Sequence, residues 1–272
     1  MKIGINAWSL PSNMTIHQGF RAAKRAHFDC VELNLDETGY MTLDSTETDA
    51  EKLRMGAENM SLEIRSVCSA LYWKYPLTSG DNSTAETAKD IVRKGLKLAS
   101  WLGADTLLVV PGVVTEDVPY DVAYLRSQMA LKELARDAEK EQVIIGVENV
   151  WNKFLLSPLE MARFIDEIGN PYVQAYFDVG NVVAYGYPQH WISILGSRIK
   201  KVHVKDFRAH IGNWDGFVNI AEGDVDWHAV RKALADVGYD DVVTAEIGGY
   251  KTLPDVGIRH AGETLKRLFK GA

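Results

Sequence analysis

The sequence predicts a (β/α)8 barrel, in which eight parallel strands are each followed by a helix. Three observations support this prediction. Short runs rich in valine, isoleucine and aromatic residues recur eight times along the chain, as expected of strands in a parallel sheet. Segments long enough for a helix separate successive runs. The chain has 272 residues, and a barrel of this type commonly needs about 250 as a single domain. We therefore expect one domain spanning residues 1–272.

The predicted strands are mainly apolar, which suits strands that are buried on both faces. The alternative architecture is an open, doubly wound sheet, but no glycine-rich phosphate-binding fingerprint follows the first run. In chain order the predicted strands span residues 3–8, 30–35, 64–70, 106–111, 143–150, 173–179, 199–206 and 242–247.

Two long segments between these runs have the apolar spacing of a helix. Residues 84–104 keep this spacing up to Gly103, which is a typical helix-stop residue. Residues 125–142 repeat the pattern with Leu125, Met129, Leu131 and Leu134.

Two further helices are predicted from their end signals. In residues 157–171, Ser157 is a suitable N-cap, Pro158 takes the first helical position, and Gly169 ends the helix. The last segment, 254–268, is expected to close the barrel and to turn two residues inward, Leu265 and Leu268.

The composition is that of a globular protein and argues against several partners. The chain is 46% hydrophobic and 25% charged, with a net charge of −7. This acidity argues against nucleic-acid binding, which needs a basic face, but not against a small phosphorylated substrate. The N-terminus lacks the apolar run of a signal peptide, and no stretch approaches the roughly 18 apolar residues of a membrane span. We therefore expect a soluble, cytoplasmic protein in which Cys30 and Cys68 are buried free thiols, a disulfide between them being the open alternative.

Four of the predicted strands carry one metal-capable residue near their carboxyl end. The residues are Glu148 in IIGVEN, Asp178 in AYFDVGN, His203 in IKKVHVKD and Glu246 in VVTAEIGG. In a barrel the carboxyl ends of the strands converge on one mouth, where active sites are built. Each residue by itself could have a structural role, but together they predict one metal site. Hard oxygen ligands with one nitrogen suit Mn²⁺, Mg²⁺ or Co²⁺, with Zn²⁺ as a further candidate.

Four motifs resemble the sugar isomerase/epimerase superfamily of xylose isomerase-like barrels, which includes ketose 3-epimerases, hydroxypyruvate isomerase and pentulose-5-phosphate 3-epimerases. The motifs are VENVWNKF, YFDVGN, TAEIGGY, and VHVKDF followed by GDVDW. The last of these is most similar to the xylulose-phosphate epimerase branch. The resemblance implies that Glu148, Asp178, His203 and Glu246 hold one divalent metal, most simply Mn²⁺, and that Glu148 and Glu246 are also the acid/base pair.

The function that this resemblance implies is a metal-dependent epimerase or isomerase that acts on a ketose or ketose phosphate through a metal-stabilised enediolate. One alternative is a lyase, such as a keto-inositol dehydratase, that uses the same metal site. A second is a sugar-binding protein without catalysis. A third is an apurinic-site nuclease, but such relatives carry extra histidines where this chain has Asn34 and Cys68-Ser69.

Several residues are candidates for contacting the sugar. Arg208 matches the position where the family holds a substrate hydroxyl or phosphate, and Asn181 stands where many members have a histidine. Trp8, Trp73 and Trp151 follow strand ends and could line a pocket or only pack the barrel.

Other polar residues near the expected mouth have less specific predictions. We expect Glu32 either to bind sugar hydroxyls or to pair with a lysine. Lys205 and Asp206 are candidates to orient the site, Lys74 is a candidate for a phosphate contact, and residues 208–227 are expected to form a loop over the mouth. The sequence does not determine whether the chain forms a homo-oligomer.

Overall fold

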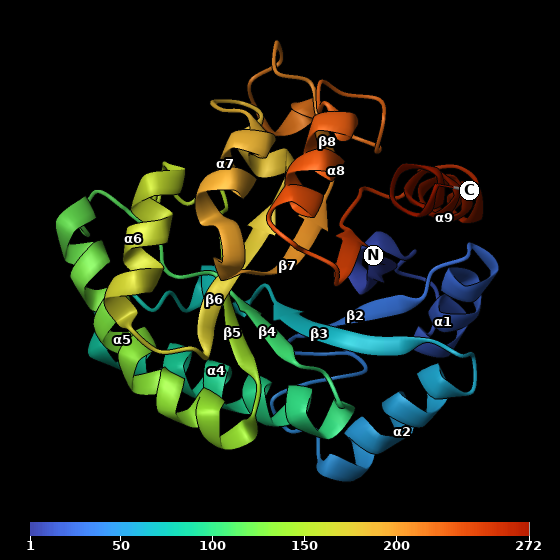
Figure 1. The fold of residues 1–272 in the computed structure, drawn as a ribbon. Helices are drawn as coiled ribbons and strands as arrows, with labels where there is room; N and C mark the ends of the chain where they lie inside the picture. Colours follow the sequence, from blue (N-terminus) through green and yellow to red (C-terminus); the bar gives the residue numbers. More distant parts are fainter. Residues whose placement is uncertain (272) are drawn as a thin grey trace.

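The computed structural model describes residues 1–271 and confirms the predicted (β/α)8 barrel. Eight parallel strands close into a barrel in the order β1-β10-β7-β6-β5-β4-β3-β2, with helices around them (Figure 1). Ala272, the last residue of the predicted domain, lies outside the described residues. The barrel strands are β1 (Lys2–Asn6), β2 (Cys30–Leu35), β3 (Glu63–Ser69), β4 (Thr106–Val109), β5 (Ile144–Glu148), β6 (Val173–Asp178), β7 (Ile199–Val204) and β10 (Val242–Ala245).

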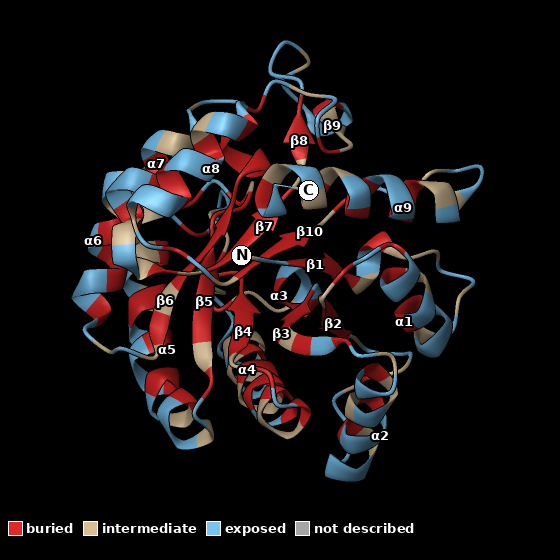
Figure 2. Cartoon of the chain, turned by 45° about the vertical axis from the view of Figure 1, so that its right-hand side comes forward, coloured by how far each residue is buried: buried red, intermediate tan, exposed pale blue. Residues whose placement is uncertain are grey.

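The main helices cover the outside of the barrel. Figure 2 shows that the strands are buried almost throughout, whereas the helices expose residues on their outer sides. These helices are α1 (Ile16–Arg25), α2 (Glu47–Glu58), α4 (Asn82–Leu102), α5 (Tyr120–Glu141), α6 (Pro158–Ile168), α7 (Pro188–Leu195), α8 (Trp227–Asp236) and α9 (Pro254–Leu265).

Shorter elements lie in the connections. A short helix α3 (Leu71–Lys74) follows β3, and the strands β8 (Asp206–Phe207) and β9 (Phe217–Val218) pair antiparallel as a separate two-stranded sheet. Single 3-10 turns follow several strands and helices, and a π turn follows α9. These turns are η1 (Ala7–Ser9), η2 (Gly180–Val182), η3 (Gly196–Arg198), η4 (Trp214–Gly216) and the π turn η5 (Lys266–Lys270).

The predicted signals at helix ends are confirmed. The Ser157 hydroxyl accepts a hydrogen bond from the Glu160 backbone N–H at 3.2 Å, with Pro158 in the first turn of α6. Gly103 and Gly169 end α4 and α6 with φ of 75° and 68°, a left-handed conformation that glycine adopts without steric cost.

The helix predicted over residues 125–142 is confirmed, but its apolar residues do not all lie on the buried face. α5 begins at Tyr120, and Leu125 and Met129 are 61% and 72% exposed, while Leu131 and Leu134 are fully buried. Leu125 and Met129 therefore lie outside the buried face of α5.

At the chain end, Leu265 is buried as expected, but the expectation that Leu268 also turns inward is wrong, because Leu268 is only half-buried. The π turn after Leu265 takes five residues, so Phe269 turns inward where a regular helix would place Leu268.

Most barrel strands end sooner than predicted. β1 stops at Asn6, whose side-chain oxygen accepts a hydrogen bond from the Trp8 backbone N–H at 2.7 Å and starts η1. β7 stops at Val204 and β10 at Ala245. As a result Glu246 lies directly after its strand, at the mouth.

Charged side chains close the amino-terminal end of the barrel. Lys201, which is fully buried, lies 2.8 Å from Asp105 and 2.5 Å from Asp241. Lys201 and His203 are two residues apart on β7, so both side chains point into the barrel, one toward each end.

Two expectations based on composition can be compared with the structure. Cys30 and Cys68 are free, buried thiols, as predicted. Within residues 1–271, none of the helices combines the length and the apolar character needed to cross a membrane.

Candidate metal centre

The four predicted metal ligands lie together at the carboxyl ends of neighbouring strands. Glu148 is the last residue of β5, Asp178 the last of β6, His203 lies near the end of β7, and Glu246 follows β10. These strands are consecutive in the barrel, and Asp178 pairs in register with His203. Barrel closure therefore brings four residues from separate motifs to one point.

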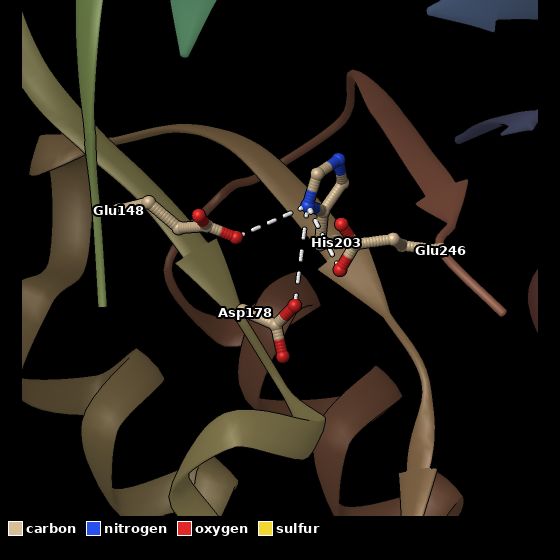
Figure 3. Close-up of side chains that lie close together, drawn as sticks. All are labelled: Glu148, Asp178, His203 and Glu246. Carbon is tan, nitrogen blue, oxygen red and sulfur yellow. Dashed lines mark hydrogen bonds and ion pairs between the residues drawn. The ribbon is translucent and has the colours of Figure 1, made fainter. Parts of the chain in front are cut away.

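The His203 ring is at the centre of this group. Its Nδ1 atom lies 3.2 Å from Glu148, 3.9 Å from Asp178 and 3.8 Å from Glu246 (Figure 3). One donor atom from each of the four residues lies within 4.8 Å of the others.

Burial and charge make this group unfavourable without a cation. Burial, with a further contribution from the neighbouring carboxylates Glu246 and Asp178, raises the pKa of Glu148 to about 7, although the hydrogen bond to His203 opposes the rise. Burial also raises the pKa of Asp178. Three carboxylates in a site of low dielectric repel one another, so a positive charge among them is strongly favoured.

Lys205 already supplies one positive charge. Its ammonium is paired with Glu246 and lies 3.0 Å from the Asp178 carboxylate. Burial opposes ionisation of Glu246, but the Lys205 charge outweighs it and holds the pKa of Glu246 below its usual value. Lys205 therefore contacts two of the candidate ligands, Asp178 and Glu246, directly.

The donor set fits a divalent metal ion. The Asp178 Oδ2 atom is buried and accepts no hydrogen bond, although the Lys205 ammonium is nearby. Two ligands on opposite sides of an ion, with bonds of about 2.2 Å, are about 4.4 Å apart, close to the spread of the four donor atoms. The residues thus offer an Asp178 oxygen that accepts no hydrogen bond, two further carboxylates and one ring nitrogen at nearly the required spacing.

Hydrogen bonds to the backbone fix the orientation of Asp178. Asn149 accepts from the Asp178 backbone N–H at 2.8 Å and donates to its carbonyl at 2.9 Å. The Asn181 backbone N–H donates to Asp178 Oδ1 at 2.8 Å, which leaves Oδ2 directed at the other ligands. The Asn181 side chain is buried and donates to the Asn149 carbonyl at 2.9 Å, so its amide also supports this turn.

The predicted tryptophans surround the carboxyl end of the barrel but differ in environment. Trp8 and Trp73 are 41% and 45% exposed. Trp8 Nε1 donates to the Asn34 side-chain oxygen at 2.7 Å, in the amide orientation that gives Asn34 its partners. Trp151 is half-buried, donates to the Asn181 carbonyl at 2.8 Å, and packs against three aromatic side chains of the β8–β9 hairpin, Phe207, Trp214 and Phe217.

Two predicted cationic residues lie outside the ligand group. Arg208 is exposed, and its Nε donates to the Glu222 carbonyl at 3.2 Å within the same loop. Lys74 is exposed and is paired with Glu37 at 2.5 Å. The loop expected at residues 208–227 contains β9 and ends at Asp226, which caps α8.

Glu32 is the residue whose position the sequence did not reveal. The expected pairing with a lysine is not seen within residues 1–271, because the Glu32 carboxylate lies inside the barrel, 2.6 Å from His203 Nε2. Asn6 and Tyr176 also donate to it at 2.6 Å. The available signal was the alternation in CVELNL, which places Glu32 and Asn34 on the opposite side from three leucine and valine residues.

Comparison with known proteins gives relatives that match most of this chain and most of their own length. SgbU of Escherichia coli (strain K12) is 27% identical over 244 residues, which cover 88% of this chain and 85% of that protein. UlaE of Salmonella paratyphi A, named an L-ribulose-5-phosphate 3-epimerase, is 26% identical over 242 residues, covering 87% of this chain and 84% of UlaE.

Solved structures share the fold. An L-ribulose 3-epimerase superposes with a TM-score of 0.82 at 18% identity, covering 99% of this chain and 95% of the other. A D-tagatose 3-epimerase-like protein gives a TM-score of 0.83 at 20% identity, covering 98% and 97%. The family model described as "Xylose isomerase-like TIM barrel" matches residues 20–268. This chain therefore belongs to the xylose isomerase-like TIM barrel family.

Proposed function

We propose that this protein is a divalent-metal-dependent epimerase that inverts carbon 3 of a ketose or ketose phosphate. The observation that carries the proposal is the placement of Glu148 and Glu246 on opposite sides of His203 and Asp178 (Figure 3). The names of UlaE and of the ketose 3-epimerase structures support the same reaction. Mn²⁺ is the metal that we propose, with Mg²⁺, Co²⁺ and Zn²⁺ as the other candidates for this donor set.

The two glutamates are proposed as the acid/base pair. A bound divalent metal would stabilise the negative charge that develops on the substrate oxygens when a proton leaves the carbon next to the carbonyl. One glutamate removes this proton from one face of the sugar, and the other returns a proton to the opposite face, which inverts the carbon. Asp178 and His203 orient the site, and Trp8, Trp151, Asn181 and Arg208 are proposed to contact the sugar.

Isotope exchange tests the reaction directly. The protein is loaded with Mn²⁺, incubated in heavy water with a panel of free and phosphorylated ketoses, and the products are analysed by proton NMR after the metal has been removed. We expect deuterium at carbon 3 and a product of unchanged composition. Deuterium at carbon 1 or 2 would instead mean aldose–ketose isomerisation, and loss of water would mean a lyase.

A substitution tests the role of the acid/base pair. Glu246→Gln is expected to reduce turnover at least about 100-fold, because a positioned acid or base commonly contributes this much. Calorimetric Mn²⁺ titration of the variant separates lost proton transfer from lost metal, and the exposed Glu263→Gln is the matched control. Wild-type turnover in Glu246→Gln would exclude this mechanism.

A further inference from the structure

Glu32 is a buried carboxylate on β2, on the side of the barrel away from the β5–β6 ligands. It is 1% exposed and accepts hydrogen bonds from Asn6, Tyr176 and His203, each at 2.6 Å. Within residues 1–271, the one ion pair of Glu32 is with His203. A buried carboxylate without a lysine or arginine partner is costly, so its contact with His203 calls for an explanation beyond packing.

The contact determines which ring nitrogen faces the other ligands. His203 Nε2 lies against Glu32, while Nδ1 lies 3.2 Å from Glu148 and 3.8 Å from Glu246. A neutral imidazole carries one proton, and the nitrogen without it has the lone pair that binds metal. Both nitrogens face a carboxylate, but Glu32 is nearer to Nε2, at 2.6 Å, than Glu148 is to Nδ1, at 3.2 Å. A metal ion that takes the lone pair of Nδ1 therefore leaves the single proton on Nε2, where Glu32 accepts it.

We propose that Glu32 is a positioning residue that fixes the tautomer and ring orientation of His203 so that Nδ1 is presented to the metal. The inference rests on the proposed metal site and adds to it a residue that does not itself touch the ion. Tyr176 and Asn6 hold Glu32 in place, and Ser66 lies 3.3 Å from the Tyr176 hydroxyl, so the support extends across the barrel interior. Such outer carboxylates raise the basicity of a ligating histidine and restrict its rotation.

Three substitutions separate the effects of charge and reach. Glu32→Ala removes the acceptor, Glu32→Asp keeps the charge but shortens the side chain by one methylene, and Glu32→Gln keeps an acceptor oxygen at the same reach without the charge. Calorimetry with Mn²⁺ is expected to show affinity about 10- to 100-fold weaker in Glu32→Ala, the usual cost of losing such a partner. Glu32→Asp is expected to be weakened as well, and Glu32→Gln to retain more affinity than either.

A spectroscopic measurement distinguishes positioning from a general loss of stability. In the Co²⁺-loaded protein, the exchangeable Nε2 proton of a ligating histidine gives a paramagnetically shifted NMR signal. We expect this signal in the wild type and in Glu32→Gln, and its broadening by solvent exchange in Glu32→Asp and Glu32→Ala. The control is Asp105→Asn at the opposite end of the barrel, where the ion pair with Lys201 is lost but the His203 contacts are unchanged.

The outcomes separate this inference from the proposed function. If the wild type binds neither Mn²⁺ nor Co²⁺, both are overturned. If the wild type binds Mn²⁺ but Glu32→Asp has the same affinity and keeps the proton signal, the inference alone is overturned. Glu32→Asp carries this decision even if Glu32→Ala fails to fold.

Discussion

Gly180 shows how a single residue allows the turn that presents Asp178. A Cβ atom added at Gly180 would lie 2.8 Å from the Lys205 carbonyl oxygen and 2.5 Å from the Lys205 side chain. Real Cβ atoms essentially never come this close to backbone, so any other residue would push the end of β6 away from the Lys205 segment. The glycine in the DVGN motif is therefore required by close packing between these segments, and its backbone angles are ordinary.

We expect Gly180→Ala to destabilise the protein by about 1–3 kcal/mol, the usual cost of overpacking a tight contact. The measurement is the urea unfolding midpoint, together with Mn²⁺ affinity. Gly80→Ala is the matched control, because its added Cβ would meet only Arg126, at 3.7 Å. In Gly80→Ala, the lower entropy of the unfolded chain should leave the free energy of unfolding unchanged or slightly higher. Equal behaviour of the two variants would contradict the packing argument.

At the scale of an element, Asp206 holds the hairpin beside the mouth. Its carboxylate accepts from the backbone N–H groups of Ala221 at 2.9 Å and Val225 at 3.1 Å, and from Trp227 Nε1 at 2.9 Å. A Cβ added at Gly223 would lie 2.3 Å from the same carboxylate. One buried side chain thus fixes the return of the loop, with Trp214 and Phe217 of the same hairpin packed on Trp151.

We expect Asp206→Asn to loosen this hairpin and leave the metal site intact. An amide nitrogen in place of one carboxylate oxygen would face N–H donors, which costs about 1–3 kcal/mol. Limited proteolysis within residues 208–226 should become faster, and KM for the ketose should rise, while Mn²⁺ affinity stays within a few-fold of the wild type. The exposed Asp215→Asn in the same loop is the control. Unchanged proteolysis in Asp206→Asn would contradict the proposed role in fixing the loop.

At the scale of the whole molecule, the barrel interior divides into two charged ends. The site occupies the carboxyl ends of the strands, and Lys201 with Asp105 and Asp241 occupies the amino ends. Burial opposes ionisation of Asp105, but the charges of Lys201 and Lys200 outweigh it and hold its pKa well below the usual range. The ionised form of Asp105 therefore stabilises the folded state.

This pKa shift predicts how stability depends on pH. The pKa of Asp105 is lower in the folded state than in the unfolded state, where it is about 4. Its contribution to the free energy of unfolding is therefore fully present above about pH 4 and is lost as the pH falls further. We expect Asp105→Asn to destabilise the protein by about 1–3 kcal/mol at neutral pH. This is less than the cost of breaking a fully buried ion pair, because Asp241 still pairs with Lys201. The difference in urea midpoint from the wild type should be constant above about pH 5 and should narrow below about pH 4.

The exposed pair of Lys232 and Asp236 offers a control for this measurement. Asp236→Asn should change the midpoint little at any pH, because exposed ion pairs contribute little to stability. A difference for Asp105→Asn that stayed constant through the acidic range would contradict the pKa argument.

The sequence by itself predicted the fold class and the four candidate ligands. Strand-like runs and helix signals are local, and each ligand ends a recognisable motif, so the barrel rule for strand ends was enough to bring Glu148, Asp178, His203 and Glu246 together. The same local rules could not place Leu125 and Met129, because apolar spacing shows that a helix has faces but not which face another element covers.

Only the tertiary structure decided what surrounds the ligands. Glu32 meets His203 across 171 residues of chain, and that contact exists because the closed barrel places the interiors of β2 and β7 within reach of each other. Lys205 likewise lies among the carboxylates because β6, β7 and β10 are neighbours. Contacts of this kind depend on how the strands are arranged around the barrel, which no motif along the chain encodes.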